Sequence, residues 1–289
     1  MSGNFYHLLG VCGILLFTLA TCTKEEIITV PNNDSPSINN VPAIRIENYV
    51  NRLFIDLLGR EPFDEEISSE VGQLKAQELS KAARVALIQK LQTADEFIGG
   101  DTSYLRAYHQ QMYNLAKVRC LDGAGDQLLR GFESNAEPSD ALRLRAVLDS
   151  RLDFQEQRIA FADMLGRMIY NNLYDELNMN TFNFVNASFD NLFWRSPTDA
   201  EFVAGFKMVE DNQSAILLGE VGQSKTDYVD IVVQSREIHE GMIIWVYQLA
   251  LARRPSTLET TALLDDFLEH RDIRIIQQEV LSSNEYANF

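Results

Sequence analysis

The residues that most often carry catalysis or bind metals are few and scattered in this chain. His109, His239 and His270 lie far apart, and His239-Glu240 has no second histidine at the spacing of an HExxH zinc motif. The sequence contains no GxSxG nucleophile turn, no GxxxxGK[ST] phosphate loop and no GxGxxG dinucleotide loop. We therefore expect packing or surface histidines, no metal and no cofactor.

Two other features suggest chemistry only weakly. Asp122-Gly123-Ala124-Gly125-Asp126 is similar to a calcium loop, but it lacks the alternating ligands and the closing bidentate glutamate of an EF-hand. Cys120 has no histidine nearby in the sequence, so we expect it to be a buried small apolar residue. Neither feature predicts a site.

Carboxylates are abundant, with 42 Asp and Glu against 25 Lys and Arg and a net charge of −17. A surface this acidic repels phosphates, which argues against nucleic-acid binding. A glycosidase-like acid pair needs two carboxylates at a defined separation, and nothing in the sequence selects such a pair. We expect no catalytic residue, with a surface hydrolase as the least favoured alternative.

One charged pattern occurs three times, in YVNRLFIDLLGREPFDEE (49–66), FVNASFDNLFWRSPTDAE (184–201) and IIWVYQLALARRPSTLE (243–259). Each of these Arg-Pro segments has an apolar periodic run, then Arg-x-Pro, then a glutamate four residues after the proline. The charged residues are Arg60 and Glu66, Arg195 and Glu201, and Arg253 and Glu259. Because active sites are seldom triplicated, we interpret the arginine and the glutamate as helix-terminal residues.

The same pattern predicts helices. Apolar residues in the first segment follow a period of about 3.6 residues, and the proline ends each helix. Thr198 with Glu201, and Ser256 with Glu259, form capping boxes for the next helix, whereas Asp64 is expected to cap in the first segment. Each unit closes with a similar motif, at 94–97, 235–238 and 283–286.

The rest of the chain also reads as helical. The insert at 101–180 should form helices joined by a loop at 120–140, and 211–228 should be a docking loop or one more short helix. The β-branched runs YVDIVV and MIIWVY could be strands, but their places in the repeats favour helices. We predict an all-α fold of three degenerate helix–Pro turn–helix repeats, with a helical insert between the first and the second.

The N-terminal residues predict where in the cell the protein is located. Residues 8–20, LLGVCGILLFTLA, form an uncharged apolar run of 13 residues, too short to span a membrane and typical of a secretory signal. The following Leu19-Ala20-Thr21-Cys22 resembles the lipobox of bacterial lipoproteins, which implies cleavage before Cys22 and lipid attachment to it. With Cys12 removed and Cys22 lipidated, Cys120 has no disulfide partner.

Lys24, Glu25 and Glu26 resemble the export signal of surface lipoproteins of Bacteroidota. That resemblance implies an outer-membrane protein that faces the medium. The alternative is a solvated charged tether. Residues 31–42 hold three of the seven prolines and four asparagines, typical of a flexible spacer.

The repeat pattern resembles a small helical module of secreted bacterial proteins, similar to the phycobilisome-linker domain. The residues that carry the likeness are the Leu-Leu-Gly-Arg-x-Pro of the first segment, the glutamates after the prolines, and Ser283-Asn284-Glu285-Tyr286. The resemblance implies an assembly or linker module of unknown function and transfers no catalytic residue. The second segment departs from it, with Trp194 in place of glycine.

Together these features give a domain plan and a ranked set of functions. The plan is a signal peptide (1–21), a lipidated tether (22–43), a first helical repeat (44–100), a helical insert (101–180) and two further repeats (181–289). The leading hypothesis is a non-enzymatic scaffold or accessory subunit, with an outer-membrane β-barrel or another envelope protein as partner. The alternative is a surface glycan- or nutrient-binding lipoprotein that works with an importer.

Trp194 is the candidate contact residue. It lies in 170–194, where aromatic residues alternate with seven asparagines, and at the predicted end of a helix. Its ring could stack on a sugar or a protein, or it could fill the junction between repeats.

Overall fold

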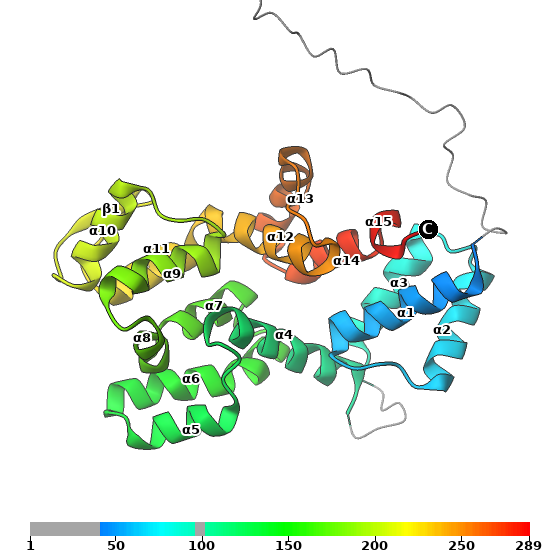
Figure 1. Ribbon diagram of the computed structural model, residues 1–289, viewed down its shortest axis with the longest axis horizontal. Helices are drawn as coiled ribbons and strands as arrows, with labels where there is room; N and C mark the ends of the chain where they lie inside the picture. The colour runs from blue at the N-terminus through cyan, green and yellow to red at the C-terminus, as the bar shows by residue number, and fades with distance from the viewer. Residues whose placement is uncertain (1–40, 96–101) are drawn as a thin grey trace, which may run out of the picture. The chain divides into compact units, whose positions relative to one another are not determined.

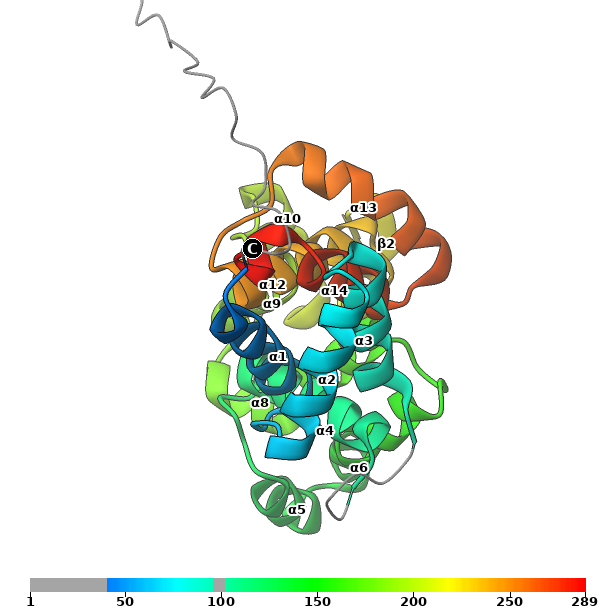
Figure 2. The ribbon, with the colours of Figure 1, turned by 90° about the vertical axis from the view of Figure 1, so that its right-hand side faces the viewer.

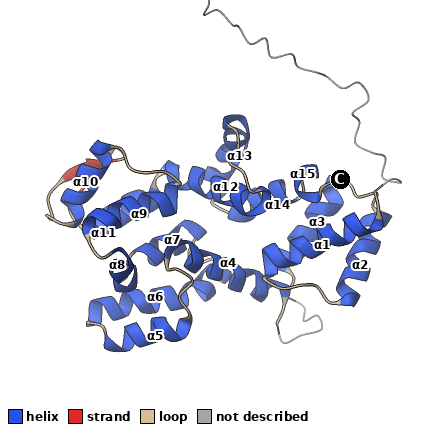
Figure 3. Ribbon diagram, in the orientation of Figure 1, coloured by secondary structure: helices blue, strands red, loops and turns tan. Residues whose placement is uncertain are grey.

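The computed structural model describes residues 41–95 and 102–289, drawn in colour in Figure 1. Within these ranges it has fifteen α-helices and one two-stranded hairpin, so the predicted all-α fold class is confirmed (Figure 3). The elements are α1 (Ala43–Leu58), α2 (Asp64–Ala76), α3 (Lys81–Thr93), α4 (Tyr104–Cys120), α5 (Asp126–Asn135), α6 (Pro138–Gln155), α7 (Phe161–Ile169), α8 (Asn172–Asn178), α9 (Thr181–Phe193), α10 (Asp199–Val209), β1 (Ala215–Leu217), β2 (Glu220–Gly222), α11 (Lys225–Gln234), α12 (Arg236–Leu251), α13 (Thr257–His270), α14 (Ile273–Leu281) and α15 (Asn284–Ala287).

The helix of the first Arg-Pro segment, α1, follows the predicted apolar stripe. Ile46, Val50 and Leu57 are buried on one face. The helix ends at Gly59, whose φ of 70° is left-handed. A Cβ at this position would lie 2.5 Å from the Oε1 atom of Gln111, so the turn combines a left-handed backbone with close packing.

The helices of the other two Arg-Pro segments end in the same backbone conformation. Trp194 closes α9 with a φ of 58°, and Ala252 closes α12 with a φ of 52°. Side chains with a Cβ adopt this region at an energetic cost. The three segments therefore share their turn geometry although only the first has glycine there.

The three segments are not arranged in space in the order of the sequence. Helices α14 and α15 pack against α3 and α1 (Figure 2), and α9 packs on α12. The C-terminal region that contains the third segment (236–287) thus contacts the regions that contain the other two. The Arg52 guanidinium joins the first to the third, because it donates to the carbonyls of Tyr286 (2.8 Å) and Ala250 (2.9 Å).

A buried polar network also links distant helices. The Tyr108 hydroxyl of α4 donates to Oε1 of Gln277 on α14 (2.7 Å). The Nε2 group of Gln92 on α3 donates to the same oxygen (3.0 Å). These side chains are buried, so each polar group needs a partner inside the protein.

The insert differs from the prediction at 120–140, which was expected to be a loop. Helix α5 occupies Asp126–Asn135, and α6 begins at Pro138. The short helix buries only Leu129 completely, and the glycines at 123, 125 and 131 around it favour a loop in the sequence. The remainder of the insert is helical as expected.

The prediction for 211–228 was also incomplete, because part of this segment is a β-hairpin. Strands β1 and β2 pair antiparallel, with Ile216 opposite Val221. Leu218 and Gly219 form the turn with φ values of 51° and 90°, the positive values that a two-residue hairpin needs. The β-branched runs are helical, in α11 and α12, as predicted.

Candidate functional site

Each of the three repeated arginines forms a two-point ion pair with the glutamate six residues later. The Nη1 and Nη2 atoms of Arg60 lie 2.7 Å from the two Glu66 carboxylate oxygens. The same atoms of Arg195 lie 2.8 and 2.7 Å from those of Glu201, and those of Arg253 lie 3.0 and 2.7 Å from those of Glu259. Planar guanidinium and carboxylate groups match in this geometry, which makes the pairing strong.

The glutamates also cap the helix that follows. The backbone N–H groups of Phe63, Thr198 and Ser256 each donate to one oxygen of the glutamate carboxylate, at a distance of 2.7 Å. The two predicted capping boxes, at Thr198 and Ser256, are confirmed. The expectation that Asp64 caps α2 was wrong. Asp64 is the first residue of that helix, and Phe63 precedes it, with only the Glu66 half of the box in place.

A second carboxylate completes two of the clusters. Arg195 also pairs with Glu237 at the start of α12. Arg253 pairs with Glu285 in α15, with both nitrogen–oxygen distances at 2.7 Å. Hydrogen bonds from Arg195 lower the pKa of Glu201 to about 2, and hydrogen bonds from Arg253 lower the pKa of Glu259 to about 2. Glu201 and Glu259 are therefore held as anions.

The cluster of the first segment has different surroundings. The Tyr104 hydroxyl donates to Oε1 of Glu66 (2.8 Å), and the neighbouring Glu70 pairs with Lys90. Burial raises the pKa of Glu66, but bonds from Arg60, the Phe63 N–H and Tyr104 outweigh it and leave that pKa lowered. Glu66, Glu70, Lys90 and Tyr104 line a pocket of about 610 Å³. Because both carboxylates are already paired with cations, neither is set up as a general acid.

Trp194 lies at the end of α9, as predicted, in a junction between helices. The Arg119 guanidinium of α4 lies 3.9 Å from the centre of the indole ring and covers one of its faces. The Trp194 carbonyl accepts a hydrogen bond from Nη2 of Arg254 (2.6 Å). The ring is partly buried, and its cation–π contact ties α9 to the end of α4.

The other residues considered for chemistry have structural surroundings. His109 and His239 are buried, and burial lowers the pKa of each. Asp126 accepts from Lys117 (2.8 Å) and Tyr113 (3.0 Å), which uses its carboxylate within the fold. Cys120 is buried as predicted, and burial raises its pKa to about 12. Among residues 41–95 and 102–289 there is no group of three potential metal ligands.

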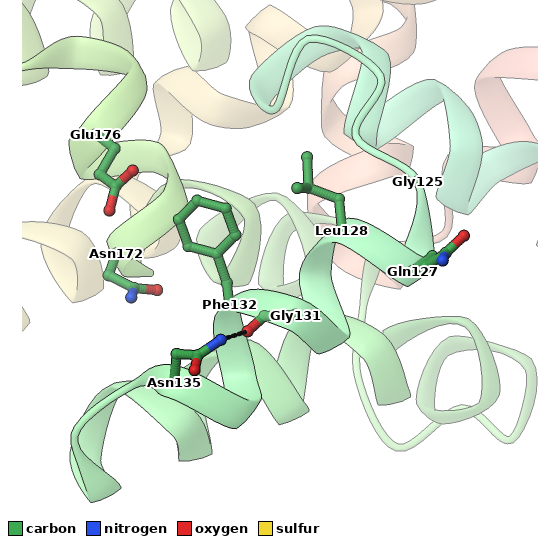
Figure 4. Close-up of a pocket in the computed structure, with 8 residues that line it drawn as sticks. All are labelled: Gly125, Gln127, Leu128, Gly131, Phe132, Asn135, Asn172 and Glu176. Carbon is green, nitrogen blue, oxygen red and sulfur yellow. Dashed lines mark hydrogen bonds between the residues drawn. The ribbon is translucent and has the colours of Figure 1, made fainter.

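One concave surface has no counterpart among the sequence predictions, the groove between α5 and α8 in Figure 4. One wall of it is α5, which lies within the expected loop at 120–140. The spacing of Leu128, Leu129 and Phe132 could have suggested a helix there, since these residues share one helical face.

The residues predicted to direct lipidation and export lie outside the described part of the chain. They are Cys22, Lys24, Glu25 and Glu26, together with the signal peptide and most of the tether. Glu96, in the closing motif of the first repeat, is outside it as well. In the described part, no helix has the length and apolar character needed to cross a membrane.

Comparison with protein-family models, with curated proteins and with solved structures gives no significant match.

Proposed function

We propose that this chain is a lipid-anchored outer-membrane lipoprotein that faces the medium and acts as a non-enzymatic scaffold or accessory subunit of an envelope complex. The location is supported by Leu19-Ala20-Thr21-Cys22 and by Lys24, Glu25 and Glu26. Several buried acyl chains on one cysteine give lasting attachment, because each buried CH₂ contributes about 0.8 kcal/mol.

A non-enzymatic role is supported mainly by the contacts of the repeated arginines and glutamates. In each Arg-Pro segment the arginine and the glutamate bond each other and the start of the next helix. Their charges thus stabilise turns of the chain itself. A glycoside hydrolase would instead need one carboxyl group kept protonated near neutral pH.

An apolar cleft supports the partner-binding part. About 150 Å³ is enclosed between α1, α4, α12 and α14. Ile55 and Leu249 form part of its wall and are about half exposed, whereas Met112 and Trp245 are buried. Protein interfaces gain most of their affinity where one large side chain fills such a pocket, so the proposed partner inserts an apolar side chain here.

The anchor is tested by fractionation of cells that express the full chain. Cys22→Ala should release the protein from the membrane, whereas Cys12→Ala, within the predicted leader, should not. Replacing Lys24, Glu25 and Glu26 together by alanine should protect the protein from protease added outside the cells. A membrane-bound Cys22→Ala protein would contradict the lipid anchor.

The partner is tested by affinity purification of the tagged full chain from gently solubilised membranes. We expect a stoichiometric envelope protein, and Leu249→Asp should remove it. Leu258→Asp is the matched control, because Leu258 is 80% exposed on α13 and does not line the cleft. Recovery of the chain alone would contradict the scaffold function.

A further inference from the structure

The groove between α5 and α8 is a second concave surface, separate from the apolar cleft. It is an open groove of about 790 Å³, a volume within the usual range for small-molecule sites. Leu128 and Phe132 project into it from α5, and Asn172 and Glu176 lie on α8 beyond the Phe132 ring (Figure 4). Gln127 and Asn135 add two more amides to its lining.

One polar atom of this groove lacks a partner. The Oδ1 atom of Asn172 is buried and accepts no hydrogen bond. Its neighbour Asn171 caps α8, because the Asn171 Oδ1 accepts from the Tyr174 N–H (3.0 Å). Asn172 therefore has no capping role, and an unsatisfied buried oxygen is unfavourable. The oxygen itself has almost no exposed surface, so a ligand reaches it only when the partly exposed Asn172 side chain turns toward the groove, where a donor on the ligand would satisfy it.

The lining selects the chemistry of the ligand. It offers three amides, one carboxylate and no basic side chain, on an apolar base formed by Phe132 and Leu128. An amide both donates and accepts, as a hydroxyl group does. An anion would meet the Glu176 carboxylate, and a cation would leave the amide N–H groups unused. We propose that this groove binds a neutral saccharide, with the C–H face of a sugar ring on Phe132 and its hydroxyls on Asn172 and Glu176.

Binding of neutral hexasaccharides of glucose, mannose, galactose and xylose to the full chain tests this proposal, by calorimetry. At least one should bind with a Kd of about 1 mM or tighter. Phe132→Ala should weaken that binding by about tenfold, since the ring contact is lost. Asn172→Leu should abolish it while the Tm stays the same or rises, because the variant removes an unsatisfied buried oxygen.

Phe182→Ala is the matched control, because Phe182 is a surface phenylalanine on α9 outside the groove. It should leave saccharide binding unchanged. Failure of all four saccharides to bind at about 10 mM would overturn the proposal. Binding that Phe132→Ala leaves intact, or tighter binding of the diamine cadaverine than of any saccharide, would overturn it as well. The outcome is independent of the lipid anchor and of the apolar cleft.

Discussion

The first and third arginine clusters have the same two-point ion pair in different surroundings. In the first, the Glu66 side chain is 3% exposed and accepts a further bond from Tyr104. In the third, Glu259 is 33% exposed, and the guanidinium also pairs with Glu285. Burial makes an unpaired charge costly, whereas water compensates an exposed one. The same motif is therefore expected to contribute unequally to stability in the two places.

The largest expected effect comes from removing each arginine in turn. Arg60→Ala leaves a buried carboxylate without its cation and should lower the free energy of unfolding by about 3 kcal/mol. Arg195→Ala, with Glu201 17% exposed, should cost about 2 kcal/mol, and Arg253→Ala about 1 kcal/mol because water screens that pair. Urea unfolding followed by circular dichroism measures all three.

Arg236→Ala is the control for this series. Arg236 forms only an exposed pair with Glu240 in the same helix, so a change below about 0.5 kcal/mol is expected. Equal losses for Arg60→Ala and Arg253→Ala would show that burial does not distinguish the clusters.

The next effect is a dependence of stability on pH. Glu201 and Glu259 have pKa values of about 2 in the folded protein, against an ordinary value of 4.5. Their lowered pKa values stabilise the fold above about pH 5, and this contribution is lost as the pH falls from there towards 2. Thermal unfolding across this range should show a falling Tm, and the fall should be smaller in Glu201→Gln. An unchanged pH profile in that variant would mean that the Arg195–Glu201 pair adds nothing to folding.

The smallest expected effect compares the residues that end the helices. Ala252 has a Cβ in a left-handed conformation, where Gly59 has none. Ala252→Gly should therefore stabilise the protein by about 0.5 kcal/mol, after the extra freedom of glycine in the unfolded chain is subtracted. Gly59→Ala should destabilise it by about 1 kcal/mol. Differential scanning calorimetry of both variants decides this, and a loss of Tm in Ala252→Gly would contradict the strain argument.

Local rules account for what could be predicted from the sequence. The α1 stripe, the boxes at Thr198 and Ser256, and the helical state of 228–233 and 242–247 depend on residues a few positions apart. The hairpin at 215–222 was not predicted, because its turn is Leu218-Gly219 and lacks the asparagine or aspartate that usually marks such turns. Helix α5 was not predicted because the glycines at 123, 125 and 131 favour a loop, although Leu128, Leu129 and Phe132 share a helical face.

The candidate sites were less accessible to prediction, because their parts come from separate segments. The sequence motif contains Arg253 and Glu259, but it does not say that Glu285 returns to the same guanidinium. Phe132 and Asn172 are 40 positions apart, and only the packing of α5 and α8 brings them to one groove.

The sequence by itself determined the all-α class, the first residues of the helices that begin with capping boxes, and the burial of Cys120. Periodicity, capping and hydrophobicity all act over short distances. Tertiary structure alone decided that the region of the third Arg-Pro segment (236–287) lies against the regions of both others, and that Arg119 covers Trp194. It also decided which carboxylates are buried and which polar oxygen is left without a partner. These properties depend on which distant surfaces exclude water from each other, and no short stretch of sequence contains both surfaces.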